Sequence, residues 1–216
     1  QQGLKYRHID AVKLQEIARF FIAAETNDWT LQTYTDNFAR LVFDNADKKK
    51  FPYQNLVDYV VNRGNRSVEI MEQNFQWNVW FALKVLTPGR TFDFDYSMPN
   101  RFNPEIDHIF PMHLAGTDDD YRENVNVMWN FQPVKGEVNN LKTNIHPKDF
   151  FMDKAKDAQG NQIQGSKYYA DYDFVPALTS ELWDDHKKFL AWRREQMLDF
   201  MEKHYGIKIK GEGIQV

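Results

Sequence analysis

The stretch from residue 105 to residue 142 constrains the fold of this chain more than any other part. Near its start lies the segment Asp107-His108-Ile109-Phe110-Pro111. The apolar residues Ile106, Ile109 and Phe110 flank the acid and the histidine. Isoleucine and phenylalanine favour a strand, and Pro111 ends it because proline cannot donate to a neighbouring strand. Asp107 and His108 would then point to opposite faces of that strand. Both can serve one site only if a twist or bulge at the strand end re-aims one of them.

A second strand and a helix are predicted further along this stretch. Polar residues 112–124 read as a connection. Apolar side chains then occupy every second position at 125, 127, 129 and 131, until Pro133. Such alternation is typical of a half-buried strand. Residues 136–143 would turn into a helix, where Asn139 and Lys142 share a face because they are three positions apart. The pattern therefore predicts a strand–loop–strand–helix unit.

The polar residues of this unit suit metal-dependent hydrolysis. Asp107 offers a carboxylate and Asn139 an amide oxygen, which are ligand types that Mg²⁺ prefers, with water and phosphate oxygens completing the shell. The imidazole of His108 has an unperturbed pKa near neutrality, so it fits a general base. Asn140 could replace Asn139 as a ligand, although the spacing to Lys142 favours Asn139.

The order and spacing of these elements resemble the HNH nuclease motif, the ββα-metal fold. The resemblance implies that Asp107 and Asn139 bind the metal and that His108 activates water. It also implies that Asn130 holds the loop between the strands and helps to orient the histidine, while Lys142 contacts a phosphate. The matching segments are D-H-I-F-P at 107–111, N-F-Q-P at 130–133 and N-N-L-K at 139–142.

Other basic residues are candidates for contacts with nucleic acid. We expect Lys135 and His146 to join Lys142 in contacting the phosphate backbone. His113 is read as a surface histidine, with an extra metal ligand as the alternative. The lysine run at 48–50 is read as a solvated loop, with a phosphate contact as the alternative.

The absence of cysteine narrows the choice of metal. The chain has no cysteine, which excludes any cysteine-based zinc site. The four-cysteine structural zinc of many HNH proteins is therefore missing, and the helices must supply that scaffolding. Asn139 stands where the family often has a histidine, as it does in RNA-guided nucleases and some homing endonucleases. The resemblance thus implies Mg²⁺ or Mn²⁺ rather than Zn²⁺.

The remainder of the chain reads as mainly helical. We expect an α+β fold, mainly α, with a helical platform at 1–90, an HNH ββα-metal core at 91–146 and a helical C-terminal part at 147–216. Apolar spacing and capping residues support the helices. The predicted elements are helices at 8–24, 29–43, 53–61 and 67–86, a strand at 92–96, a short helix from Pro147, and a long helix from Thr179 or Ser180 to Gly206.

Composition limits the classes of function. Hydrophobic residues make up 42% of the 216 residues, which is typical of a globular chain. No apolar run approaches the ~18 residues of a membrane helix, so we expect a cytoplasmic protein without a membrane partner. The net charge of −4 does not favour nucleic-acid binding, but local patches and a bound cation can offset it. Because the chain begins with Gln1 and has no signal-peptide core, we expect a fragment of a longer protein.

Together these features predict a metal-dependent enzyme that hydrolyses phosphodiester bonds. The resemblance to HNH nucleases implies that it is an endonuclease and that DNA is its substrate. The flanking helices resemble C-terminal nuclease domains of multidomain restriction and phage-defence proteins. That resemblance implies an N-terminal sensor or nucleotide-hydrolysing domain as a partner. The alternative is a non-catalytic nucleic-acid-binding or structural module that retains an HNH-like core.

Overall fold

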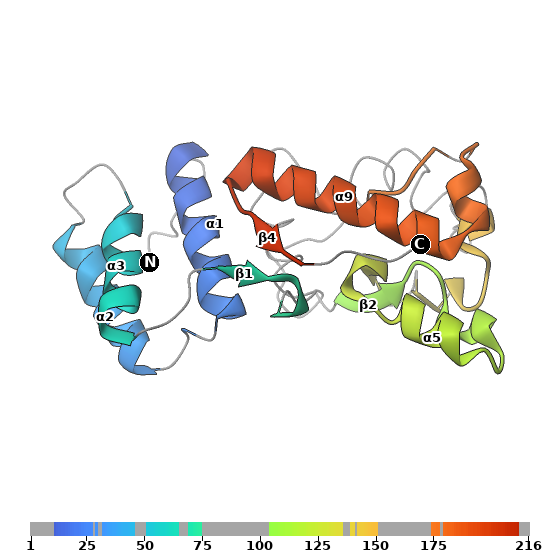
Figure 1. Cartoon of the computed structure of the whole chain (residues 1–216), viewed down its shortest axis with the longest axis horizontal. Helices are drawn as coiled ribbons and strands as arrows, with labels where there is room; N and C mark the ends of the chain where they lie inside the picture. The colour runs from blue at the N-terminus through green and yellow to red at the C-terminus, as the bar shows by residue number, and fades with distance from the viewer. Residues whose placement is uncertain are drawn as a thin grey trace. The chain divides into compact units, whose positions relative to one another are not determined.

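The computed structural model describes residues 11–27, 29, 32–45, 51–64, 69–74, 104–135, 139–140, 142–150, 174–177 and 179–211 (Figure 1). The fold is α+β and mainly α, with small two-stranded sheets, as the sequence predicts. Within the described part of the chain, no helix is long and apolar enough to cross a lipid bilayer.

The chain divides into two compact units that do not follow the predicted boundaries. The first unit contains residues 1–87 and 198–211, and the second contains residues 88–197 and 212–216. The predicted C-terminal part is therefore split between them. The longest element described in that part is α9 (His186–Tyr205), whose last residues belong to the first unit.

Three helices form most of the described first unit, namely α1 (Ala11–Thr26), α2 (Gln32–Asp44) and α3 (Tyr53–Gly64). These three match the predicted helices. A buried cluster that includes Ala23, Trp29 and Val60 joins them, and Phe20 and Phe38 pack against it with their rings edge to face, 4.9 Å apart. Burial of these apolar side chains is the main force that holds this unit together.

A short strand replaces the start of the predicted fourth helix. Residues 70–71 form β1 (Ile70–Met71) and residues 72–74 form the 3₁₀ helix η2 (Glu72–Asn74). Ile70 is buried and pairs in parallel with Ile209 of β4 (Ile209–Lys210). Pairing with a distant segment has overridden local helical spacing here. The rest of that helix and the predicted strand at 92–96 lie outside the described residues.

The second unit is built around an antiparallel hairpin of β2 (Pro104–His108) and β3 (Phe131–Lys135). The register places Asp107 opposite Gln132 and His108 opposite Phe131. β2 forms where the sequence predicts the first strand. The connection holds η4 (Met112–Ala115), α5 (Asp119–Val125) and η5 (Met128–Asn130).

The second strand begins later than the sequence pattern predicts. Residues 125–130 belong to the end of α5, a bend and η5, and β3 starts only at Phe131. Val125 and Trp129 are both buried, and their four-residue separation suits helical turns as well as a strand. Pro133 lies inside β3, opposite Ile106, and does not end it. A two-stranded sheet leaves each strand one unpaired edge, where the missing N–H of proline is tolerated.

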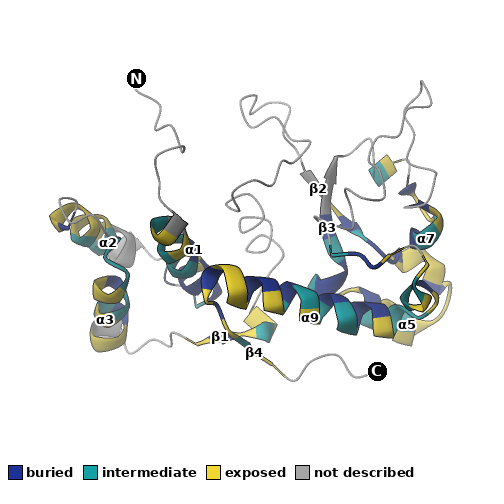
Figure 2. Ribbon diagram, turned by 90° about the horizontal axis from the view of Figure 1, so that it is seen from above, coloured by how far each residue is buried: buried dark blue, intermediate teal, exposed yellow. Residues whose placement is uncertain are grey.

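Helix α9 packs against the hairpin through a buried arginine. Its buried residues recur every three or four positions, as the burial colouring of Figure 2 illustrates. Arg193 is fully buried and donates to the carbonyl oxygens of Trp129 and Phe131, the latter at 3.0 Å. This contact fixes the start of β3. The helix ends at Gly206, whose φ of 62° suits glycine, as predicted.

The described part of the second unit also includes two shorter helices. α7 (Pro147–Asp149) begins at Pro147 as predicted, and η7 (Glu181–Asp184) begins after Ser180, whose hydroxyl accepts from the Leu182 amide. Asp185 then accepts from the Lys188 amide, and α9 starts at His186, well after the predicted start at Thr179 or Ser180. The core of the unit includes Ile109, Phe110, Val125, Phe150, Val175, Trp183, Phe189 and Leu190.

Candidate active site

Asn130 ties the two ends of the loop between the strands. Its side chain is fully buried. The amide oxygen accepts from the Phe110 N–H at 2.9 Å, and the amide nitrogen donates to the carbonyls of Phe110 at 3.0 Å and Val125 at 2.7 Å. The backbone carbonyl of Asn130 also accepts from the Ile109 N–H at 2.9 Å. These bonds hold the backbone immediately after His108. The sequence predicts that Asn130 holds the loop between the strands in this way.

Asp107 lies in a buried polar cluster on one face of the hairpin. Its Oδ2 accepts from Gln132 Nε2 and from Lys142 Nζ, each at 2.6 Å. Lys142 Nζ also donates to the His108 carbonyl. Because the carboxylate and ammonium neutralise each other, their burial is compensated by the ion pair and its hydrogen bonds.

The predicted phosphate contact of Lys142 does not agree with this arrangement. The residue is only 1% exposed, and its ammonium is engaged by Asp107 and the His108 carbonyl. A phosphate cannot reach an ammonium that is enclosed in this way. Burial lowers the pKa of Lys142, while the neighbouring Asp107 carboxylate opposes that shift. Lys142 is a counter-ion for Asp107 here, and this corrects the expected role.

His108 lies on the other face of β2. Its ring packs edge to face on Phe131, with centroids 4.8 Å apart, and Nε2 lies 3.2 Å from Asn126 Oδ1. An acceptor at Nε2 selects the tautomer that carries its proton there, which leaves a lone pair on Nδ1. Burial lowers the pKa of His108, and the Asn126 hydrogen bond and the Asp107 charge only partly oppose this shift. The imidazole is therefore neutral at pH 7.

The regular strand keeps Asp107 and His108 on opposite faces. Both residues pair in register with β3, and no bulge interrupts residues 104–108. The condition that a bulge re-aims one of them is not met within β2. His108 is the last residue of the strand, so a substrate must lie across the strand end to meet both groups.

Asn139 faces the hairpin, whereas Asn140 is exposed. The Asn139 amide nitrogen donates to Glu105 Oε2 at 2.8 Å. Residues 139, 140 and 142 are helical, and the Thr143 N–H donates to the Asn139 carbonyl at 3.1 Å. The helical turn thus brings Asn139 and Lys142 to the same face of the hairpin, next to Glu105 and Asp107. This geometry favours Asn139 over Asn140 as a ligand.

The other predicted contact residues are spread around the unit. His146 caps α7 by accepting from the Lys148 N–H at 3.3 Å, and its ring stacks edge to face on Phe110, with centroids 5.9 Å apart. His113 is exposed, as expected of a surface histidine. Lys135 closes β3 opposite Pro104, and the position of its side chain lies outside the described residues, as does the lysine run at 48–50.

Sequence reasoning did not single out Gln132 or Asn126 as partners of the predicted residues. It left Glu105 open between a carboxylate that supports a metal ligand and an exposed side chain. Gln132 contacts Asp107, and Glu105 contacts Asn139. Asn126 contacts His108. The first two follow from the strand register, because Gln132 faces Asp107 and Glu105 shares a face with Asp107. A correct start for β3 would have revealed them. Asn126 has no sequence signal, since the bend between α5 and η5 places it.

The residues on the Asp107 face fit a hard cation by the chemistry of their donors. Asp107 Oδ2 is occupied, so Oδ1 is the oxygen it can offer, and Asn139 can offer its amide oxygen. Gln132 Oε1 is buried and has no hydrogen-bond partner among the residues that the structure describes. A buried acceptor without a donor is typical of a missing water or ion. Within the described residues, no three His, Asp or Glu side chains lie close enough together to hold a metal. A metal site here therefore needs amide oxygens as ligands.

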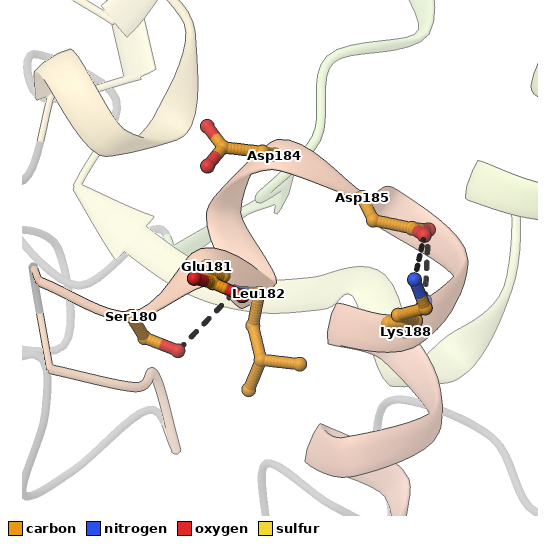
Figure 3. Close-up of a pocket in the computed structure, with 6 residues that line it drawn as sticks. All are labelled: Ser180, Glu181, Leu182, Asp184, Asp185 and Lys188. Atoms are coloured by element: carbon orange, nitrogen blue, oxygen red, sulfur yellow. Dashed lines mark hydrogen bonds and ion pairs between the residues drawn. The ribbon is translucent and has the colours of Figure 1, made fainter.

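A separate hollow of about 840 Å³ lies beside η7 and the first turn of α9 (Figure 3). It is open and mixed in charge, and the Asp185 carboxylate pairs with Lys188 at 3.1 Å across its edge. None of the motif residues lines it. It is therefore not part of the candidate active site. The lining residues are Ser180, Glu181, Leu182, Asp184, Asp185 and Lys188.

Comparison of the chain with models of known protein families, with curated proteins and with solved structures finds no match. The case for a function therefore rests on the motif and on the geometry described above.

Proposed function

We propose that the chain is a metal-dependent endonuclease of the HNH type that hydrolyses phosphodiester bonds in DNA. The observation that carries this proposal is the hairpin and helical turn that bring Asp107 and Asn139 to one face. Asn130 fixes the loop that follows His108. The same residue types in the same order make up the ββα-metal motif that the sequence resembles.

In this proposal Asp107 and Asn139 would hold Mg²⁺ or Mn²⁺ through carboxylate and amide oxygens. Such a cation, when bound, supplies a Lewis acid that stabilises the charge on the phosphate and on the leaving 3′ oxygen. His108 accepts a proton from the attacking water at Nδ1, and Asn126 steadies the imidazolium through Nε2. The products carry a 5′-phosphate and a 3′-hydroxyl.

The biological setting that we propose is the nuclease effector of a restriction or phage-defence system. Only the resemblance of the flanking helices supports it, and it implies a sensor or nucleotide-hydrolysing domain as a partner. Cleavage of modified and unmodified DNA, compared side by side, tests this setting. Equal cleavage of both would argue against discrimination by the nuclease part alone.

The decisive experiment is a plasmid-nicking assay with His108→Ala. Wild-type protein should nick supercoiled plasmid with Mg²⁺ or Mn²⁺ and not with EDTA, and the variant should lose about 10²- to 10⁴-fold in rate, the usual contribution of a general base. His204→Ala, which removes an exposed histidine, is the matched control and should cut normally. Undiminished cutting by His108→Ala would remove the base from the proposal.

One observation favours the alternative of a non-catalytic module. The Asp107 carboxylate already has a cation, the Lys142 ammonium, and needs no metal for charge balance. This alternative predicts that Mn²⁺ leaves the melting temperature unchanged, whereas a bound metal stabilises the folded state by mass action. A thermal melt with and without Mn²⁺ separates the two functions.

A further inference from the structure

The contact between Glu105 and Asn139 has a direction that determines what Asn139 can offer. The Asn139 amide nitrogen donates to Glu105 Oε2 at 2.8 Å. A carboxylate only accepts hydrogen bonds, so it can face the NH₂ end of an amide but not the oxygen end. The amide oxygen of Asn139 is therefore turned away from Glu105. Without this partner, nothing in that contact would distinguish the two ends of the amide.

The position of Glu105 on β2 allows it to accept this hydrogen bond from Asn139. It lies two residues before Asp107 and so on the same face of β2. Its side chain is half-buried, and among the described residues it forms no ion pair; the Asn139 amide is its hydrogen-bond partner. Lys142, a basic residue of the same helical turn as Asn139, pairs with Asp107 instead. The Glu105 carboxylate thus serves as the hydrogen-bond acceptor for the Asn139 amide.

We propose that Glu105 is a positioning residue that orients the Asn139 amide with its oxygen toward the cation. This inference rests on the proposed function, because it assigns a partner to one of the two proposed ligands. Asp107 is oriented in a parallel way, since Gln132 and Lys142 both occupy its Oδ2. Mutation of a group that hydrogen-bonds to a metal ligand typically lowers metal affinity by about 10- to 100-fold.

The test measures Mn²⁺ affinity by calorimetry and by electron paramagnetic resonance, without reference to cleavage. Glu105→Leu removes the acceptor and should weaken Mn²⁺ binding by about 10- to 100-fold. Glu105→Gln retains an oxygen that can accept from Asn139, so it should weaken binding less. Glu123→Leu removes an exposed carboxylate of α5 and is the matched control, with wild-type affinity expected. Circular dichroism of each metal-free variant verifies that it is folded.

A double-mutant cycle then shows whether Glu105 acts through Asn139. If it does, Glu105→Leu should cause no further loss of Mn²⁺ affinity in an Asn139→Ala background. A further loss there, or equal losses for Glu105→Gln and Glu105→Leu, would make Glu105 a charged ligand and overturn the positioning role. If the wild-type protein binds Mn²⁺ and Glu105→Leu binds it with the same affinity, the positioning role of Glu105 is overturned and the proposed metal site is not. A folded wild-type protein that binds no Mn²⁺ overturns the proposed metal site as well.

Discussion

Replacement of Asn130 by alanine should destabilise the second unit more than any exposed substitution. The side chain makes three hydrogen bonds to backbone groups of Phe110 and Val125 and is fully buried. At about 1 kcal/mol each, their loss costs about 3 kcal/mol. Backbone groups left buried without a partner raise this to about 3–5 kcal/mol. A typical domain is stable by only about 5–15 kcal/mol, so the loss is a large fraction.

Urea unfolding followed by circular dichroism measures this change in the free energy of unfolding. Hydrogen exchange of the Phe110 amide gives a local readout, because that amide donates directly to Asn130 Oδ1. Asn130→Asp keeps the acceptor but replaces the donor nitrogen with an oxygen that faces two carbonyls, so it should cost at least as much. Asn124→Ala, which removes a solvent-exposed hydrogen bond from a half-buried asparagine to the Asp120 carbonyl, should cost about 0.5 kcal/mol or less. If Asn130→Ala lowers stability no more than Asn124→Ala does, the loop is not held in this way.

Two further predictions concern the half-buried histidine His186 and the buried ion pair of Lys142 and Asp107. Burial lowers the pKa of His186. As the pH falls below about 6.5, His186 therefore becomes protonated in the unfolded state but stays neutral in the folded state. The free energy of unfolding decreases until the pH passes the pKa of His186 in the folded state. His186→Phe should flatten this decrease in urea titrations between about pH 6.5 and pH 5, and an unchanged slope would exclude His186 as its source. Lys142→Met should cost about 3–5 kcal/mol by leaving Asp107 buried without a counter-ion, and Asp107→Asn in the same chain should restore part of it. Equal stability of Lys142→Met and wild type would show that the pair contributes little.

The sequence predicts the first three helices and β2 because their signals are local. Apolar spacing marks the helices, and Pro111 marks the end of the Asp-His strand region. The start of β3 is mispredicted because Val125 and Trp129 fit helical and strand spacing equally well. Only tertiary contacts decide between them, chiefly the buried Asn130 side chain and the Arg193 bonds to this segment.

In the candidate site, too, the local sequence predicts which residues take part, whereas their contacts depend on packing between distant segments. The motif fixes the order of Asp107, His108, Asn130 and Asn139, but not what each of them contacts. Lys142 was predicted to face a phosphate, yet it is buried against Asp107, since the helical turn carries its side chain toward the hairpin. The direction of a long side chain depends on the packing of the helix that carries it, which spacing alone does not specify.

The pairing of β1 with β4 has a consequence for how the chain folds. Ile70 meets Ile209 in a parallel pair, so the first unit is closed by residues that lie near the other end of the sequence. The second unit is in effect an insertion between the two segments of the first. During synthesis, α1, α2 and α3 emerge long before their closing strand, whereas the β2–β3 hairpin is complete within a short stretch. Contacts over long sequence separations form slowly because the intervening loop must first be closed. The inserted unit can therefore mature first, and its folding shortens the effective loop between β1 and β4.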